Sequence, residues 1–236
     1  MVQVKEFNNL FLEDSGWDVI HALVIVVGAL VSLSLGDTMS LFVIALVSFI
    51  YFITLNKEPK HTFLPFRTYA NWVTAIRLLL LLLIIAIWSS LHTTLLISVL
   101  IVIVALDRVD GHLARRFKQE SLWGRAFDVE VDSLFVLFCC VYLIISHAMP
   151  LWLIIPGLMR YSYIIILKII NPTVQKERSN KIASYVAGMF YLSLLWSIAD
   201  QSNLQQIVLM VSSILIVVSF LISYYYLWLD NKHPIT

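Results

Sequence analysis

The sequence predicts an all-α membrane protein, a polytopic helix bundle with eight transmembrane helices, on the basis of three observations. The chain of 236 residues is 60% hydrophobic and only 13% charged, whereas soluble domains are about 45–50% apolar and about 25% charged. Its apolar residues fall into long runs that approach the roughly 20 residues needed to cross a bilayer. Between these runs, lysine and arginine occur only in alternate connections.

Eight apolar runs are long enough to be considered as spans, although the second and fourth are short or interrupted. They cover residues 19–36, 39–55, 71–89, 93–109, 127–147, 150–170, 183–199 and 204–228. The first run follows no basic leader and no clear cleavage site, so we expect it to be retained. The first two spans contain few reactive side chains, and we assign His21 a structural or interfacial role. We therefore divide the chain into a two-helix N-terminal extension (1–56) and a six-helix core with a juxtamembrane segment (57–236).

The distribution of positive charge predicts the orientation. With eight spans, both termini and every second loop lie on the same side. The loops on that side contain Lys5, Lys57, Lys60, Arg67, Arg115, Arg116, Lys118, Arg125, Lys176, Arg178, Lys181 and Lys232, and the opposite loops contain no Lys or Arg. Because basic loops stay in the cytoplasm, this pattern predicts cytoplasmic termini and a cytoplasmic loop over 110–126. We favour a bacterial inner membrane over an organelle membrane.

Four aspartates near this loop suggest a metal site: Asp107, Asp110, Asp128 and Asp132. Carboxylates at membrane depth are costly and usually functional. The members of each pair are three or four residues apart and share a helix face, and a short connection can bring the two faces together. Carboxylate oxygens suit Mg²⁺ or Mn²⁺ rather than zinc. Two such ions can share ligands and act on a phosphoryl group.

The residues between the aspartates fit a phosphate ligand. The full pattern is Asp107-x2-Asp110-Gly111-x2-Ala114-Arg115-x8-Gly124-x3-Asp128-x3-Asp132. Gly111 has no side chain where a ligand could approach the backbone, and Ala114 keeps the same face shallow. Arg115 lies about two turns after Asp107 and could neutralise a phosphate. Gly124 allows close packing where the chain enters the fifth span.

This pattern resembles the signature of the CDP-alcohol phosphotransferase family at every position, and a looser resemblance extends over residues 67–228. A second segment, Asn71-Trp72-Val73-Thr74-Ala75-Ile76-Arg77, is similar to the Asn-x-x-Thr-x-x-Arg stretch that opens the core of that family. Ala70 stands where the family often has proline. The resemblance implies an integral membrane enzyme of phospholipid synthesis, and family members often form homodimers.

The resemblance also implies roles for individual residues. Asp107, Asp110 and Asp128 would hold two divalent ions, and Asp132 would be the general base and could also contact a metal. The CDP-linked substrate would be bound by Asn71, Thr74, Arg77, Gly111, Ala114, Arg115 and Gly124. Asp132 would deprotonate an alcohol that attacks CDP-diacylglycerol, and CMP would leave.

The acceptor alcohol and two wider alternatives stay open. Arg160, the basic residue nearest mid-span, could bind an anionic acceptor or a lipid phosphate, or it could pair with a carboxylate such as Asp132 or Glu130. Lys181 is a second candidate for the acceptor site. The donor could instead be CDP-choline or CDP-ethanolamine, with diacylglycerol as acceptor. Outside the family, the acidic cluster could line a divalent-cation transport path or belong to a catalytically silent scaffold. Expected partners are the CDP-linked lipid, a small alcohol or lipid acceptor and membrane lipids, with no nucleic acid.

Overall fold

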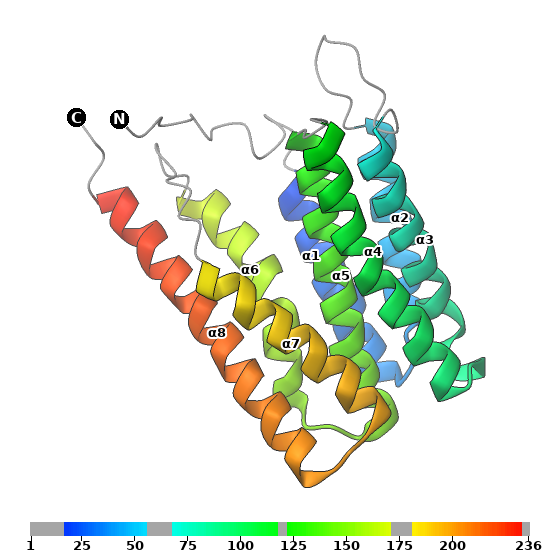
Figure 1. The fold of residues 1–236 in the computed structure, drawn as a ribbon. Helices are drawn as coiled ribbons and strands as arrows, with labels where there is room; N and C mark the ends of the chain where they lie inside the picture. The colour runs from blue at the N-terminus through cyan, green and yellow to red at the C-terminus, as the bar shows by residue number, and fades with distance from the viewer. Residues whose placement is uncertain (1–16, 56–67, 118–121, 171–180, 233–236) are drawn as a thin grey trace.

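The computed structural model describes residues 17–55, 68–117, 122–170 and 181–232, and within them the chain is a bundle of eight α-helices (Figure 1). In chain order these are α1 (Trp17–Leu35), α2 (Met39–Leu55), α3 (Tyr69–Ile87), α4 (Thr93–Phe117), α5 (Leu122–His147), α6 (Ile154–Ile170), α7 (Lys181–Ala199) and α8 (Asn203–Lys232). Two short 3-10 helices, η1 (Trp88–Ser90) and η2 (Leu151–Leu153), lie between them.

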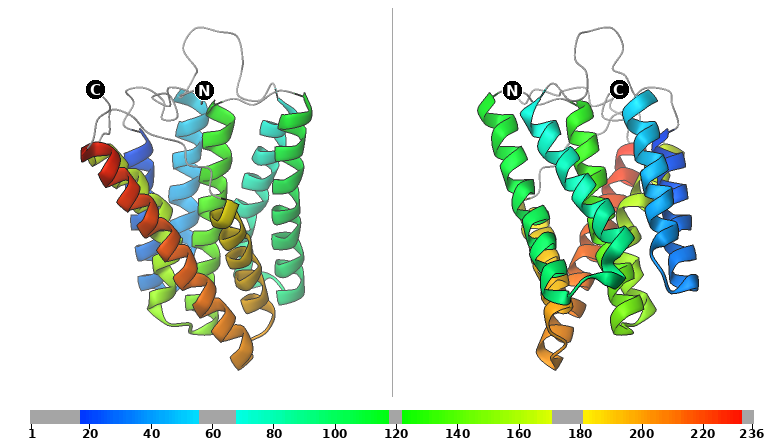
Figure 2. Two further views of the ribbon diagram at one scale, coloured as in Figure 1. Left: turned by 60° about the vertical axis from the view of Figure 1, so that its left-hand side comes forward. Right: turned by 90° about the vertical axis from the view of Figure 1, so that its right-hand side faces the viewer.

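Consecutive helices run in opposite directions, so the bundle alternates up and down (Figures 1 and 2). The turn between α1 and α2 shows how tightly some connections close. Gly36 has a φ of +69°, a conformation that glycine adopts at little cost, and the Asp37 N–H donates to the carbonyl of Ser32 at 3.1 Å. This is the usual way in which a glycine ends a helix and reverses the chain.

Helix α5 is the central element of the bundle. It packs against α1, α3, α6 and α7, and its Phe127, Val131, Leu134 and Leu137 are fully buried. Helix α4 packs against α3 and α7, whereas α1 and α2 form a hairpin whose first helix also contacts α6. The hairpin therefore packs against α5 through α1 and against α3 through α2.

Six of the described helices are long and apolar enough to cross a membrane: α1, α3, α5, α6, α7 and α8. Helix α2 is apolar but shorter, and α4 is not among the six. Apolar side chains point outward, including Leu23, Val27 and Leu30 on α1 and Ile207 and Ile214 on α8, which suits a lipid environment. The chain is an integral membrane protein, and the eight-span topology stays a prediction.

The helices match the expected spans closely, with one correction. The sequence predicts a loop over 110–126, but α4 continues to Phe117 and α5 already begins at Leu122. The error arises because charged residues lower the hydropathy without ending a helix, and Ala, Leu and Arg are good helix formers. Asp110 is therefore on the same continuous helix as Asp107.

Close packing of α6 on α5 depends on Gly157. A Cβ atom at this position would lie 3.2 Å from Leu137 Cδ1 and 3.3 Å from both the Leu137 Cα and the Cys140 Sγ. Small residues at helix contacts let backbones approach each other in membrane proteins. Since a backbone atom cannot move aside as a side chain can, this contact should tolerate no larger residue.

We predict that Gly157→Leu destabilises the protein by about 1–3 kcal/mol through overpacking. Gly188→Leu is the matched control because it adds the same side chain inside a helix where nothing lies within 4 Å of the added Cβ. Thermal unfolding of both variants in the same detergent measures the difference. Equal melting temperatures for the two variants would contradict the proposed tight contact.

Candidate metal and phosphate site

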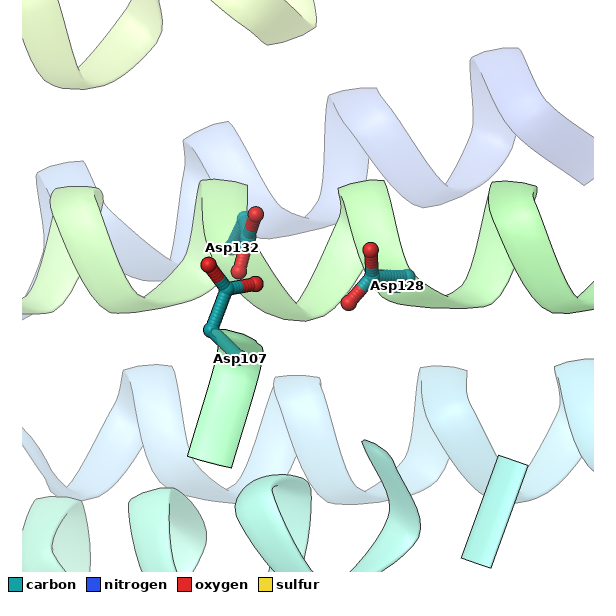
Figure 3. A group of neighbouring side chains, drawn as sticks. All are labelled: Asp107, Asp128 and Asp132. Carbon is teal, nitrogen blue, oxygen red and sulfur yellow. The ribbon is translucent and has the colours of Figure 1, made fainter. Parts of the chain in front are cut away.

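Three of the four predicted aspartates form a cluster between α4 and α5. One carboxylate oxygen from each of Asp107, Asp128 and Asp132 lies within 4.8 Å of the others. Asp128 and Asp132 lie one turn apart on α5, and Asp107 approaches them from α4 (Figure 3). All three side chains are half-buried, between 30% and 39% exposed. The cluster is thus both enclosed by helices and open to a ligand.

Arg77 of α3 ion-pairs with all three carboxylates. Its Nη1 donates to Asp128 Oδ1 at 2.6 Å and its Nη2 lies 3.1 Å from Asp107 Oδ1, while Nη2 also donates to Asp132 Oδ1. The Arg77 side chain is only 2% exposed. A planar guanidinium with several donors suits such a shared contact better than an ammonium group. Arg77 therefore fixes α3, α4 and α5 relative to one another at the depth of the cluster.

The same face of α3 contains Asn71 and Thr74, both of which are buried. Thr74 donates its hydroxyl hydrogen bond to the Ala70 carbonyl at 3.2 Å, and Thr68 accepts from the Asn71 N–H at 3.2 Å as the helix N-cap. The spacing of three residues places these side chains in line with Arg77. The Asn-x-x-Thr-x-x-Arg segment is thus a buried polar stripe that leads to the aspartates.

The donor set of the cluster fits a divalent cation. Three carboxylates contribute a charge of −3 and Arg77 contributes +1, which leaves −2. Two unit charges 4 Å apart interact by about 4 kcal/mol at an effective dielectric constant of 20, so this excess is costly without a further cation. Mg²⁺ and Mn²⁺ prefer such oxygen ligands. Asp107, Asp128 and Asp132 are the described residues that could hold the ion.

Several predicted site residues lie where the side chains are not described. Asp110, Gly111, Ala114 and Arg115 follow Asp107 on α4, and Lys181 is the first residue of α7. The helical register alone keeps the first four within a face of α4 close to that of Asp107. Gly124 is partly buried in the first turn of α5. Their roles stay predictions.

Tyr191 of α7 is a neighbour of the cluster that the sequence did not reveal. Its hydroxyl donates to the backbone carbonyl of Asp132 at 3.4 Å, and its ring stacks on Phe135 with centroids 5.4 Å apart. A single tyrosine in an apolar run has no pattern that sets it apart from a packing residue. Only the fold, which packs α7 against α5, brings it to the site.

Arg160 and Glu130 form a separate ion pair. Arg160 Nη2 lies 3.5 Å from Glu130 Oε1, so the pairing of Arg160 with a carboxylate, one of the two sequence alternatives, is present in the structure. Glu130 is about 200° around α5 from both Asp128 and Asp132. It therefore lies on the far side of the helix from the aspartate cluster, beside α1 and α6.

Residues 67–224 match the sequence model of the CDP-alcohol phosphatidyltransferase family. The chain belongs to this family. Both the aspartate cluster and the α3 stripe lie inside the matched segment, whereas the α1–α2 hairpin lies before it. Membership makes the protein a transferase of phospholipid synthesis and implies a CDP-linked lipid substrate and an alcohol acceptor.

One relative of known activity is also similar. The chain is 28% identical over 152 residues to CDP-diacylglycerol–glycerol-3-phosphate 3-phosphatidyltransferase of Haemophilus influenzae. The aligned segment covers 60% of this chain and 82% of the relative. No solved structure matches the chain. The homodimer suggested by the family resemblance gains no support from the single chain described.

We predict that Arg77→Gln lowers stability strongly, because it leaves three carboxylates without their shared cation. Removing one partner of a buried ion pair typically costs about 3–5 kcal/mol. Arg108→Gln, next to Asp107 but exposed on α4, removes the same charge and should leave the melting temperature nearly unchanged. Millimolar Mg²⁺ should partly restore Arg77→Gln. A melting temperature equal to that of Arg108→Gln would show that Arg77 does not hold the cluster together.

Proposed function

We propose that this protein transfers a phosphatidyl group from CDP-diacylglycerol to an alcohol and releases CMP. The observation that supports this most is the cluster of Asp107, Asp128 and Asp132, which lies within the family match. The relative from Haemophilus influenzae is, by its name, a CDP-diacylglycerol enzyme. This favours CDP-diacylglycerol as the donor over a CDP-activated choline or ethanolamine.

The proposed reaction exchanges one bond at phosphorus for another. Asp132 takes the proton of the alcohol hydroxyl, and the hydroxyl oxygen bonds to the lipid-linked phosphorus. The bond from that phosphorus to the oxygen of CMP breaks, and CMP leaves with the bonding electrons. Bound divalent ions would supply charge stabilisation at the phosphate oxygens. An aspartate is a weak base, so catalysis also requires that the hydroxyl be held and acidified.

The remaining residues would bind and orient the donor. Asp107, Asp110 and Asp128 would hold two Mg²⁺ or Mn²⁺ ions together with Asp132. Arg115, on the extension of α4 beyond the cluster, would face the diphosphate, and Gly111 and Ala114 would leave room for it. Asn71, Thr74, Arg77 and Gly124 would complete the CDP site. Arg77 has a second role, because its contacts with the three carboxylates keep the site assembled.

We further propose eight spans with both termini and the site in the cytoplasm of a bacterial cell. The alternation of the described helices is consistent with this arrangement (Figure 2), and the basic loops supply the orientation. The extension (1–56) and the core (57–236) would then be two parts of one membrane domain. Helix α2 is short for a span, so a locally thin bilayer or a small tilt of its neighbours would be needed.

Glycerol 3-phosphate is the acceptor that we propose to test first, because the name of the relative specifies it. Arg160 and Lys181 are the candidate partners for its phosphate. Arg160 is 24% exposed and contacts Glu130 through a single nitrogen at 3.5 Å. A guanidinium has five N–H donors, so this one long contact leaves capacity for an anionic ligand.

The direct test measures CMP release by the purified full-length chain. CDP-diacylglycerol is supplied with Mg²⁺ or Mn²⁺ and with glycerol 3-phosphate, glycerol, inositol, inositol phosphate and serine in turn. CMP release that depends on the metal and on one acceptor is expected. Release only from CDP-choline or CDP-ethanolamine with diacylglycerol would reverse the roles of the substrates. No CMP release, with metal uptake by liposomes that contain the protein, would indicate a transporter.

We predict that Asp132→Asn abolishes CMP release but leaves binding of CDP-diacylglycerol almost intact, because the amide cannot accept the alcohol proton. General-base catalysis typically contributes about 10²–10⁴-fold. Single-turnover rates and equilibrium binding separate the two effects. Asp128→Asn is the comparison and should weaken both. An equal loss of binding and turnover in Asp132→Asn would make Asp132 chiefly a metal ligand.

We predict that Arg160→Lys raises the KM for a phosphate-bearing acceptor about tenfold, the equivalent of about 1.4 kcal/mol. Lysine keeps a cation beside Glu130 but loses the planar fork that binds phosphate through two nitrogens. The KM for CDP-diacylglycerol is the internal control and should not change. A folded Arg160→Lys variant with an unaltered acceptor KM would remove Arg160 from the acceptor site.

A further inference from the structure

The α1–α2 hairpin, which lies before the family match, supplies a buried histidine to the core. His21 of α1 is 0% exposed. Its Nδ1 is 2.5 Å from the Ser48 hydroxyl of α2, and its Nε2 is 3.6 Å from Glu130 Oε2 of α5. Glu130 Oε1 in turn lies 3.5 Å from Arg160 of α6. A chain of polar groups therefore crosses four helices.

The negative charge of Glu130 favours one tautomer of the His21 imidazole. If Ser48 donates to Nδ1, then Nε2 carries the ring proton, and at 3.6 Å from Glu130 Oε2 it is too far for a hydrogen bond but close enough for electrostatic attraction. The opposite tautomer would set the Nε2 lone pair against a carboxylate oxygen. A hydrogen bond to one ring nitrogen commonly fixes the tautomer of a histidine in this way. The Ser48 hydroxyl therefore orients His21 toward Glu130.

Aromatic contacts also hold the α1–α2 hairpin against α5. Phe52 of α2 stacks on Trp123 with centroids 5.1 Å apart and on Phe127 with centroids 5.8 Å apart, and Phe49 lies 6.2 Å from Phe127. Trp123, Phe127 and Glu130 are spaced by four and three residues along α5, so they form one face of that helix. This face is occupied by the hairpin.

The opposite face of the same two turns holds Asp128 and Asp132. Phe127 precedes Asp128 directly, and Glu130 lies midway between the two aspartates. A rotation of α5 that moved Glu130 would therefore move both aspartates by a similar arc. Mg²⁺ demands near-ideal geometry at about 2.0–2.1 Å, so shifts of a few tenths of an ångström should weaken its binding.

We propose that His21 is a positioning residue for the aspartate cluster, acting through Glu130 and the backbone of α5. The hairpin then sets the rotation of the central helix and with it the spacing of Asp128 and Asp132 against Asp107. Without His21, Glu130 would lose the imidazole that lies 3.6 Å from its Oε2 and would be less well compensated at membrane depth, which is costly for a carboxyl group. The helix would turn or shift to bring Glu130 closer to Arg160. This inference rests on the proposed function in that the cluster binds a divalent ion.

The test compares Mn²⁺ binding and turnover in the full-length chain. Electron paramagnetic resonance of free Mn²⁺ gives the dissociation constant without any substrate. We expect His21→Leu to raise this constant at least threefold and to lower kcat, with the KM for CDP-diacylglycerol unchanged. His21→Gln, whose amide can donate toward Glu130, should restore most of the loss. A folded His21→Leu variant with wild-type Mn²⁺ affinity would overturn the proposal.

A matched control separates positioning from general stability. Ser212→Ala removes a fully buried polar contact between α7 and α8, where the Ser212 and Ser193 hydroxyls are 2.7 Å apart. It should lower the melting temperature but leave Mn²⁺ affinity unchanged. If Ser212→Ala weakens Mn²⁺ binding as much as His21→Leu does, the effect of His21 is merely structural and the proposal fails.

Two further outcomes are decisive. If His21→Leu does not fold, Ser48→Ala keeps the imidazole but removes the group that orients it, and it should weaken Mn²⁺ binding in the same direction. No change in Ser48→Ala would then overturn the proposal. A wild-type protein that binds Mn²⁺ but releases no CMP refutes the proposed reaction alone, because the variants still report on positioning. A wild-type protein that binds no Mn²⁺ refutes both.

Discussion

The interaction on which the site depends is the contact of one buried guanidinium with three carboxylates. Asp107, Asp128 and Asp132 belong to two helices that would repel each other at this depth without a cation between them. Arg77 enters from a third helix and contacts all three. It offsets one of three negative charges, so the helices are held together while a net negative charge remains. A site of this kind is assembled before a divalent ion arrives and still attracts one.

This arrangement explains why the polar residues of α3 lie in a single buried stripe. A charged side chain inside a membrane protein must reach its partners without exposing its own helix to lipid. Arg77 meets this condition because α3 packs directly against both α4 and α5. Tyr191 extends the same enclosure from α7, since its hydroxyl contacts the backbone of Asp132. The cluster is therefore surrounded by three consecutive helices, α3, α4 and α5, and by α7, which is distant in the sequence.

The sequence predicted the helices well, because apolar runs and their polar breaks are local properties. The prediction of a loop over residues 110–126 was wrong, because helix propensity continues there although hydropathy falls. Helix α4 therefore extends to Phe117. Helical spacing also predicted that Asp128 and Asp132 share a face and that a short connection brings Asp107 beside them. Local patterns could not show that Arg77 ion-pairs with the three aspartates, because that depends on how α3 packs. For the same reason Tyr191 and the contact of His21 with Glu130 were not predicted.

The two faces of α5 suggest why the hairpin matters to the core. One face bears Asp128 and Asp132, and the other bears Glu130, which is only 6% exposed. A core that began at α3 would leave Glu130 and Arg160 on a surface turned toward lipid, where an ion pair with one 3.5 Å contact is poorly compensated. His21 fills that surface with a ring nitrogen 3.6 Å from Glu130 Oε2, and the Ser48 hydroxyl lies 2.5 Å from the other ring nitrogen. The hairpin thus places polar groups where the buried carboxyl group of Glu130 needs them. A chain with Glu130 between its two α5 aspartates needs such a cover to keep that helix in one orientation.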